Sequence, residues 1–125
     1  MSTIFSKIVA GEIPAYKVAE DEHFLAFLDI NPLAQGHTLV IPKKEIDYIF
    51  EMDDGWYSEF HLFAKRVACA IKQVIPCEKI GVAVIGLEVA HAHIHLVPIN
   101  SIYALDFGKP KLKLTSEELA GLADA

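Results

Sequence analysis

The sequence predicts a single α+β domain, in which an antiparallel sheet of about five strands packs against one long helix and one short helix. Several short segments are rich in β-branched and aromatic residues, and turn residues separate them. One longer segment, residues 53–74, has helical periodicity instead. A chain of 125 residues is long enough for one core and too short for two. We therefore expect residues 1–125 to form one domain, with residues 100–125 as a C-terminal tail.

The N-terminal third of the chain predicts a short helix followed by three strands. Residues 3–14 begin with a helical pattern, which a glycine and a proline end, and its apolar face comprises Ile4, Phe5, Ile8 and Val9. Residues 15–21 and 23–30 are strand-like and are separated by an acidic turn. A third strand, residues 37–42, follows a turn that contains Asn-Pro and Gly. Short turns between consecutive strands predict antiparallel pairing.

The longest predicted element is a helix over residues 53–74. Its apolar residues recur at intervals of three and four positions: Trp56, Phe60, Phe63, Val67, Ala70, Ile71 and Val74. Two aspartates favour the N-terminus of this helix, and a proline closes it. Residues 79–86 and 92–99 are β-branched and predict two further strands. Thr115 and Glu118 form a capping-box pattern, which predicts a last short helix in the tail.

Composition and charge exclude several classes of protein. A net charge of −6 argues against a nucleic-acid binder, because no basic face would neutralise a phosphate backbone. No apolar stretch approaches the ~20 residues that span a bilayer. Residues 1–20 alternate charged and apolar positions, unlike the core of a signal peptide. We therefore expect a cytoplasmic protein that binds neither nucleic acid nor membrane, although one small phosphorylated ligand remains compatible with the charge.

Three histidines at alternate positions are the most unusual feature of the sequence. They are His91, His93 and His95, and they lie in the otherwise apolar segment VAHAHIHLVPI, residues 89–99. On a strand they would project from one face, roughly 6–7 Å apart per step. The opposite face would then enter the core with Ala92, Ile94 and Leu96. Because the unperturbed pKa of imidazole lies near neutrality, this row can supply a nucleophile, a proton donor and hydrogen-bond donors.

The residues alone leave three interpretations of this row open. The histidines could lie on a solvated strand face without further function. They could bind zinc as a His-x-His pair, with His37 or Glu88 as a third ligand. In the third interpretation, one histidine attacks an electrophile such as phosphorus, and the others stabilise the charge that develops.

Three motifs together resemble the histidine triad (HIT) family. The segment HAHIHLV, residues 91–97, matches the family signature His-φ-His-φ-His-φ-φ at every position, where φ is apolar. Residues 4–44 are similar to the N-terminal half of the Hint branch, with the motifs FxKIxxGEIP and LAFLDINPxxxGHTLVIPK. Only the C-terminal tail lies outside the resemblance.

The resemblance implies a HIT-like fold, a homodimer with a continuous sheet, and a nucleotide hydrolase or nucleotidyl transferase. Such an enzyme cleaves nucleoside phosphoramidates or related nucleotides at the α-phosphate, without a metal ion or other cofactor. By resemblance, His93 would attack phosphorus and form a covalent nucleotidyl-histidine, from which water releases the nucleoside monophosphate. The His91 carbonyl would accept the Nδ1 proton of His93, while His95 would donate to a phosphate oxygen and His37 would support the triad.

The resemblance also implies how a purine nucleotide is bound. Asp29 would hold the ribose hydroxyls, because a carboxylate can accept two hydrogen bonds; without the resemblance it would simply begin the turn that follows. An apolar slot for the base would be formed by residues that otherwise look like ordinary core: Phe5, Ile8, Ile13, Leu28, Ile30 and Leu39.

Two features depart from the Hint branch. Many members have an Asn and a Gly-rich loop ending in Gly-Gln-Ser-Val before the triad, whereas residues 84–93 here form a shorter loop with Glu88 in place of the Ser. A carboxylate repels an α-phosphate unless it is protonated or turned away. We therefore expect Glu88 to be an acid/base group, a partner that orients a histidine, or a residue that points elsewhere. In the tail, Lys109, Lys111 and Lys113 alternate, and they would either meet phosphate or form a solvated edge, the alternative that we favour.

Other functions stay open alongside the phosphoramidase-like hydrolase. One is a dinucleoside polyphosphate hydrolase, as in the Fhit branch. Another is a nucleotide-binding interaction protein with little turnover, which the altered loop would favour, and a third is a metalloenzyme. His95, where a sugar-nucleotide transferase would have Gln, argues against that branch of the family.

Overall fold

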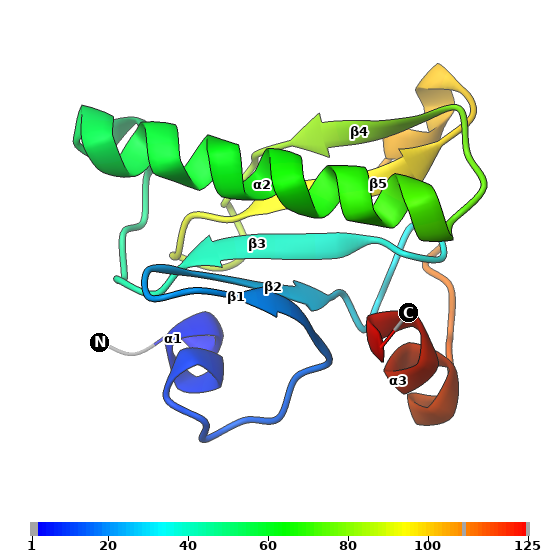
Figure 1. The fold of residues 1–125 in the computed structure, drawn as a ribbon, viewed down its shortest axis with the longest axis horizontal. Coiled ribbons are helices and arrows are strands. Elements are labelled where there is room, and N and C mark those ends of the chain that lie inside the picture. The colour runs from blue at the N-terminus through cyan, green and yellow to red at the C-terminus, as the bar shows by residue number, and fades with distance from the viewer. Residues whose placement is uncertain (1–2, 109, 125) are drawn as a thin grey trace.

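The computed structural model describes residues 3–108 and 110–124 of the chain. Figure 1 shows the long helix lying across the sheet, with the two short α-helices near the side of the sheet formed by the first two strands. The elements in chain order are α1 (Ile4–Val9), β1 (Lys17–Glu20), β2 (Phe24–Leu28), β3 (Thr38–Pro42), η1 (Ile49–Glu51), α2 (Asp54–Val74), β4 (Lys79–Ala83), β5 (Ile94–Ile99), η2 (Ile102–Leu105) and α3 (Ser116–Asp124).

The five strands form one antiparallel sheet in the order β1-β2-β3-β5-β4. This confirms the predicted α+β class. The strand β5 pairs with β3, although α2 and β4 separate them in sequence, and Leu39 lies opposite His95 in this pairing. The crossover therefore places the C-terminal histidine segment next to the N-terminal half of the chain.

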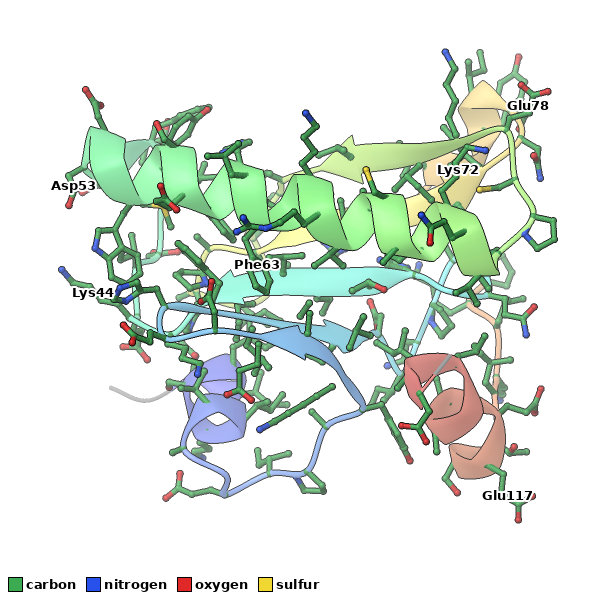
Figure 2. The ribbon with its side chains drawn as sticks, viewed as in Figure 1. Lys44, Asp53, Phe63, Lys72, Glu78 and Glu117 are labelled. Carbon is green, nitrogen blue, oxygen red and sulfur yellow. The ribbon has the colours of Figure 1, made fainter. Side chains whose placement is uncertain are left out.

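Side-chain caps begin the three α-helices, and Figure 2 labels Asp53 at the N-terminal end of α2. Thr3 caps α1 by accepting the Ser6 N–H, and the Ser6 hydroxyl lies 2.8 Å from the Thr3 N–H, which completes a capping box. Asp53 caps α2 by accepting the Trp56 N–H. The Thr115–Glu118 capping box is present at 3.1 Å in both directions, and α3 follows it.

The two faces of the sheet bury different sets of residues. On one face, α2 packs against alternate strand residues in a core that includes Phe24, Ala26, Val40, Phe60, Phe63, Val67, Ile71, Ala92, Ile94 and Leu96. On the other face, α1 packs against the remaining alternate positions in a smaller cluster of Phe5, Ile8, Leu25, Phe27, Leu39 and Ile41. Because side chains alternate along a strand, α1 and α2 cover opposite faces.

The structure corrects the predicted bounds of the last two strands. The strand β5 begins at Ile94, so His91 and His93 precede it, and only His95 is a strand residue. The Ala92 N–H donates to the Ile46 carbonyl at 2.6 Å, which lies outside the sheet, and this ends the ladder before it reaches the first two histidines. The strand β4 ends at Ala83, ahead of Gly86, whose φ of +72° favours glycine.

The C-terminal tail packs against the sheet. The helix α3 packs against β1 and β2, and Leu119 is buried. The Leu112 N–H donates to the Pro32 carbonyl at 2.8 Å, which ties the segment between η2 and α3 to the turn that follows β2. Over the described ranges, no helix combines the length and hydropathy that would let it cross a membrane.

Candidate active site

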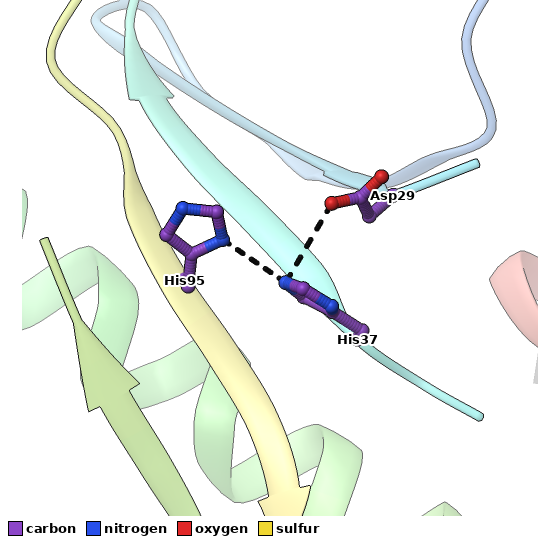
Figure 3. Close-up of side chains that lie close together, drawn as sticks. All are labelled: Asp29, His37 and His95. Carbon is purple, nitrogen blue, oxygen red and sulfur yellow. Dashed lines mark hydrogen bonds and ion pairs between the residues drawn. The ribbon is translucent and has the colours of Figure 1, made fainter. Parts of the chain in front are cut away.

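Three strand ends bring the candidate site together. Asp29 follows β2, His37 precedes β3, and His95 lies on β5 beside them (Figure 3). The turn between β2 and β3 is held by the Asp29 N–H, which donates to the His37 carbonyl at 3.0 Å. Gly36 adopts a φ of +92°, so a left-handed residue immediately precedes His37 and lets the chain enter β3.

The hydrogen bonds of His37 and His95 fix where their protons lie. The Leu33 N–H donates to His37 Nδ1 at 3.0 Å, so this nitrogen must present a lone pair. Burial lowers the pKa of His37 to about 4 and that of His95 to about 3, so both rings are neutral near pH 7. A neutral His37 therefore carries its proton on Nε2, which lies 3.0 Å from His95 Nδ1 and donates to it.

This chain of donors leaves His95 with its proton on Nε2. In Figure 3 that nitrogen is directed away from His37. The Leu33 N–H donates to His37, and His37 in turn donates to His95. His95 therefore presents its own N–H on the side away from His37. A fixed N–H of this kind can stabilise negative charge on a substrate oxygen.

The neighbouring histidine has the opposite polarity. His93 Nδ1 lies 2.7 Å from the His91 carbonyl, which can only accept, so this nitrogen carries a proton. This confirms the predicted contact between the two residues. A neutral His93 then has its lone pair on Nε2, and its ring centroid lies 4.9 Å from that of His95. An imidazole lone pair and an imidazole N–H therefore lie on adjacent side chains.

His91 contributes its carbonyl to the site, while its ring supports the fold. His91 Nε2 donates to the Pro42 carbonyl at 2.8 Å, and its Nδ1 accepts from the Thr3 hydroxyl at 3.1 Å. The ring thereby joins the N-terminus of α1 to the end of β3. Burial lowers the pKa of His91, so the ring stays neutral in this role.

Exposure separates the four histidines into two pairs. The relative exposure of His91 is 0% and that of His37 is 1%, whereas His93 and His95 retain 6% and 8%. His93 and His95 are therefore the more accessible pair, and His37 and His91 are enclosed behind them.

Asp29 lies beside this cluster with a partly exposed carboxylate. Its Oδ1 accepts the Asn31 N–H at 2.9 Å, and its Oδ2 lies 3.7 Å from His37 Nε2. Burial is the largest influence on this carboxyl and raises its pKa. Because His37 is neutral near pH 7, the two groups do not form an ion pair there, and Oδ2 can accept a hydrogen bond from a ligand.

Asp29, His37 and His95 also offer three metal-ligand atoms within 4.8 Å of one another. A metal ion would need the lone pair of His37 Nε2, which would move the proton of a neutral ring to Nδ1. That proton would then face the Leu33 N–H, which already donates to Nδ1. The hydrogen bonds thus hold the proton of His37 on Nε2, and this donor set does not fit a metal ion.

Apolar residues beside the histidines form the candidate slot for a base. The Phe5 ring lies edge-on to His93, with centroids 4.9 Å apart, and also contacts Phe27 at 5.6 Å. Ile8 and Leu39 belong to the same buried cluster, and Ile13 packs against it.

The placement of Leu28 differs from its prediction as a slot residue. Leu28 lines a cavity between α2 and α3, on the opposite face of the sheet. Strand alternation explains the difference, because Phe27 and not Leu28 has the same parity as Asp29. Phe27, which the sequence analysis did not select, is therefore the residue of β2 that joins the cluster of Phe5, Ile8 and Leu39, and the alternation could have identified it. Ile30 comes after the end of β2 and is 61% exposed, outside the buried cluster.

Charged groups from two other segments border the site. Glu88 is exposed in the loop between β4 and β5, where its negative charge raises the pKa of Asp29. Lys111 is half-buried in the tail. Its positive charge partly opposes the raising of the Asp29 pKa by burial, and it adds to the lowering of the His37 pKa by burial. The Phe107 ring lies 4.6 Å from that of His95. No pattern in the sequence indicated Phe107, and Lys109 lies outside the described residues.

Comparisons with known proteins relate this chain to a single family. Residues 10–102 match the family model described as the HIT domain. The chain is 42% identical to the protein hit of Bacillus subtilis over 102 residues, covering 76% of this chain and 69% of that protein. It is 37% identical to the adenosine 5′-monophosphoramidase of Schizosaccharomyces pombe over 130 aligned positions, covering 99% of this chain and 95% of that protein. A solved HIT-like protein of Bartonella henselae superposes with a TM-score of 0.84 at 30% identity, covering 98% and 92% of the two chains.

Proposed function

Because this chain belongs to the HIT domain family, we propose that it binds a purine nucleotide and hydrolyses it at the α-phosphate through a covalent intermediate on His93. Family membership and the adenosine 5′-monophosphoramidase relative support a nucleotide hydrolase in general terms. The proposed substrate is a nucleoside phosphoramidate, since the relative that aligns with almost the whole chain bears that activity in its name.

The observation that best supports the proposal is the opposite polarity of two adjacent imidazoles. His93 Nδ1 is held by the His91 carbonyl at 2.7 Å, so its Nε2 lone pair is available to attack phosphorus. His95 Nδ1 accepts from His37 at 3.0 Å, so its Nε2–H can donate to a phosphate oxygen. The proton positions needed for attack and for charge stabilisation are therefore fixed by the fold before substrate arrives.

The proposed reaction has two steps. In the first, His93 Nε2 forms a bond to phosphorus while the bond from phosphorus to the leaving nitrogen breaks, and the amine leaves with a proton from water. His93 is then a nucleotidyl-imidazolium, whose Nδ1–H is stabilised by the His91 carbonyl. In the second step, water attacks phosphorus, the bond to His93 breaks, and the nucleoside monophosphate leaves together with the surplus proton.

The rest of the proposed nucleotide is bound by neighbouring groups. Asp29 Oδ2 accepts the ribose hydroxyls, and Phe5 with its cluster receives the base. Phe27 replaces Leu28 in this slot because of its side of the sheet. An acid/base or orienting role for Glu88 remains a prediction.

Adenosine phosphoramidate, incubated with and without a chelator, tests the proposal. We expect turnover that a chelator does not affect, because the hydrogen bonds of His37 do not favour a metal ion. His93→Ala should abolish hydrolysis and leave the affinity for AMP within roughly tenfold, since it removes the nucleophile and not the base or ribose contacts. His23→Ala is the matched control, because His23 is an exposed histidine in the turn that precedes β2.

Other outcomes would select the alternatives. Hydrolysis retained by His93→Ala would contradict the assignment of the nucleophile. Tight AMP binding without turnover in the wild-type protein would favour an interaction protein. Preferred cleavage of a dinucleoside polyphosphate would favour the Fhit-like alternative, and activity lost with a chelator would favour a metalloenzyme.

We also propose that the protein is a homodimer with a continuous sheet. The strand β4 lies at an edge of the sheet, and its Val82 is 57% exposed. An exposed edge strand of this kind is a template for pairing with a second copy. Sedimentation equilibrium that gave the mass of a single chain would contradict this proposal. A cytoplasmic location remains a prediction.

A further inference from the structure

We propose that Lys111, on the segment between η2 and α3, provides the cationic contact for the phosphate group of the substrate. This inference rests on the proposed nucleotide function and adds a binding residue from the tail. It concerns the part of the chain that the sequence motifs do not cover.

The structure holds Lys111 at the edge of the histidine site. Its ammonium donates to the Phe107 carbonyl, and the Phe107 ring packs edge-on against His95 at 4.6 Å and His37 at 6.1 Å. The adjacent Leu112 donates its N–H to the turn after β2. Figure 1 shows this orange segment running down beside the chain that enters β3. Contacts on both sides of Lys111 therefore fix its backbone against the site.

The other charged groups described at the site are carboxylates. Burial, and to a smaller extent the charge of Glu88, raises the pKa of Asp29, and burial keeps the His37 and His95 rings neutral. The loop before the triad, residues 84–90, contains apolar residues, one glycine and one glutamate, so its side chains offer no cation or hydroxyl to an anion. A nucleotide phosphate placed among these groups would meet negative charge and neutral hydrogen-bond donors.

The position of Lys111 meets that need. Its charge already acts on Asp29, the proposed ribose contact, and on His37, which is hydrogen-bonded to His95, the proposed phosphate donor. A lysine ammonium serves a phosphate as a compact point charge, and a partly buried position reduces the screening of that charge by water. The tail would thus supply the positive charge that the loop before the triad lacks.

Calorimetric binding of adenosine, AMP and ADP to the full chain tests the inference, because these ligands differ only in phosphate charge. Lys111→Met should weaken AMP binding about tenfold and ADP binding at least as much, while adenosine affinity changes less than about twofold. Lys113→Met is the matched control, since Lys113 is an exposed lysine on the same segment, and it should leave all three affinities unchanged. Raising the salt concentration should weaken AMP binding in the wild type and have less effect in Lys111→Met.

The pattern across ligands separates the possible explanations. Equal loss of adenosine and AMP affinity in Lys111→Met would show that the lysine only supports the Phe107 carbonyl, and this would overturn the inference. Unchanged AMP affinity would overturn it as well. Asp29→Asn should weaken the binding of adenosine and of AMP alike, because it changes the proposed ribose contact. A wild-type protein that binds neither ligand would contradict the proposed function itself, and the inference with it.

Discussion

The two sides of the histidine segment are both buried, yet they hold opposite kinds of side chain. Ala92, Ile94 and Leu96 lie in the core under α2, with relative exposures of 1%, 0% and 1%. On the other side, His93 and His95 are also nearly buried, but they are polar. Burial by itself therefore does not distinguish a structural face from a chemical face.

The difference between the two sides lies in what each neighbour must provide. The apolar side needs neighbours of suitable volume, and hydrophobic residues of similar size can exchange there at modest cost. The imidazole side needs a donor or an acceptor for each nitrogen that is buried, because an unpaired buried polar group is costly. In the described part of the chain, every buried side-chain nitrogen and oxygen has a hydrogen-bond partner. Substitutions on the imidazole side should consequently lower activity, and substitutions on the apolar side should lower stability.

The largest expected effect is on catalysis, from the imidazole side. His95→Ala should lower kcat for adenosine phosphoramidate by about 10²-fold or more, because it removes a fixed donor to the developing negative charge. His95→Gln retains an N–H donor and should keep more activity than His95→Ala. Steady-state kinetics on both variants measures this, and equal activity in all three proteins would show that the histidine polarity has no catalytic role.

The next effect is on stability, from the apolar side. Ile94→Ala should lower the free energy of unfolding by about 3 kcal/mol, because the site is fully buried and a cavity would remain. Ile94→Val should cost about 1 kcal/mol. Urea unfolding measures both, and kcat per folded molecule should change little. A large loss of kcat in an Ile94 variant that keeps its full stability would contradict the distinction between the apolar side and the imidazole side.

The smallest effect is a pH dependence that originates in the imidazole side. The pKa of His37 is lowered from 6.5 to about 4, so the unfolded chain takes up this proton at higher pH than the folded protein does. The free energy of unfolding should therefore be highest above pH 6.5 and should fall as the pH decreases toward 4. His37 alone should account for about 2 kcal/mol between pH 7 and pH 5.

Urea unfolding at several pH values measures this contribution. His37→Asn should show a shallower fall in stability than the wild type over the same interval, and His23→Ala should keep the wild-type profile. If the slope were the same in His37→Asn, the buried neutral state of His37 would not be a source of the pH dependence.

Much of the fold could be predicted because its signals are local. Capping residues, the helical period of residues 53–74 and the short turns between strands each depend on neighbouring positions, and the structure has the corresponding elements. The contact between His93 Nδ1 and the His91 carbonyl was expected from the resemblance to the HIT family, and it joins residues only two positions apart. The resemblance also assigns Leu28 to the slot, whereas the structure places its side chain in the cavity between α2 and α3.

By itself, the sequence determined the order of the elements and the apolar and imidazole sides of residues 89–99. Only the tertiary structure decided that His37 donates to His95, because that bond joins residues 58 positions apart through the pairing of β3 with β5. The position of Lys111 was decided in the same way, by contacts between the tail and the turn after β2. Residues that are distant in sequence become partners only where packing places them in contact, and a local sequence pattern does not specify which distant residues will meet.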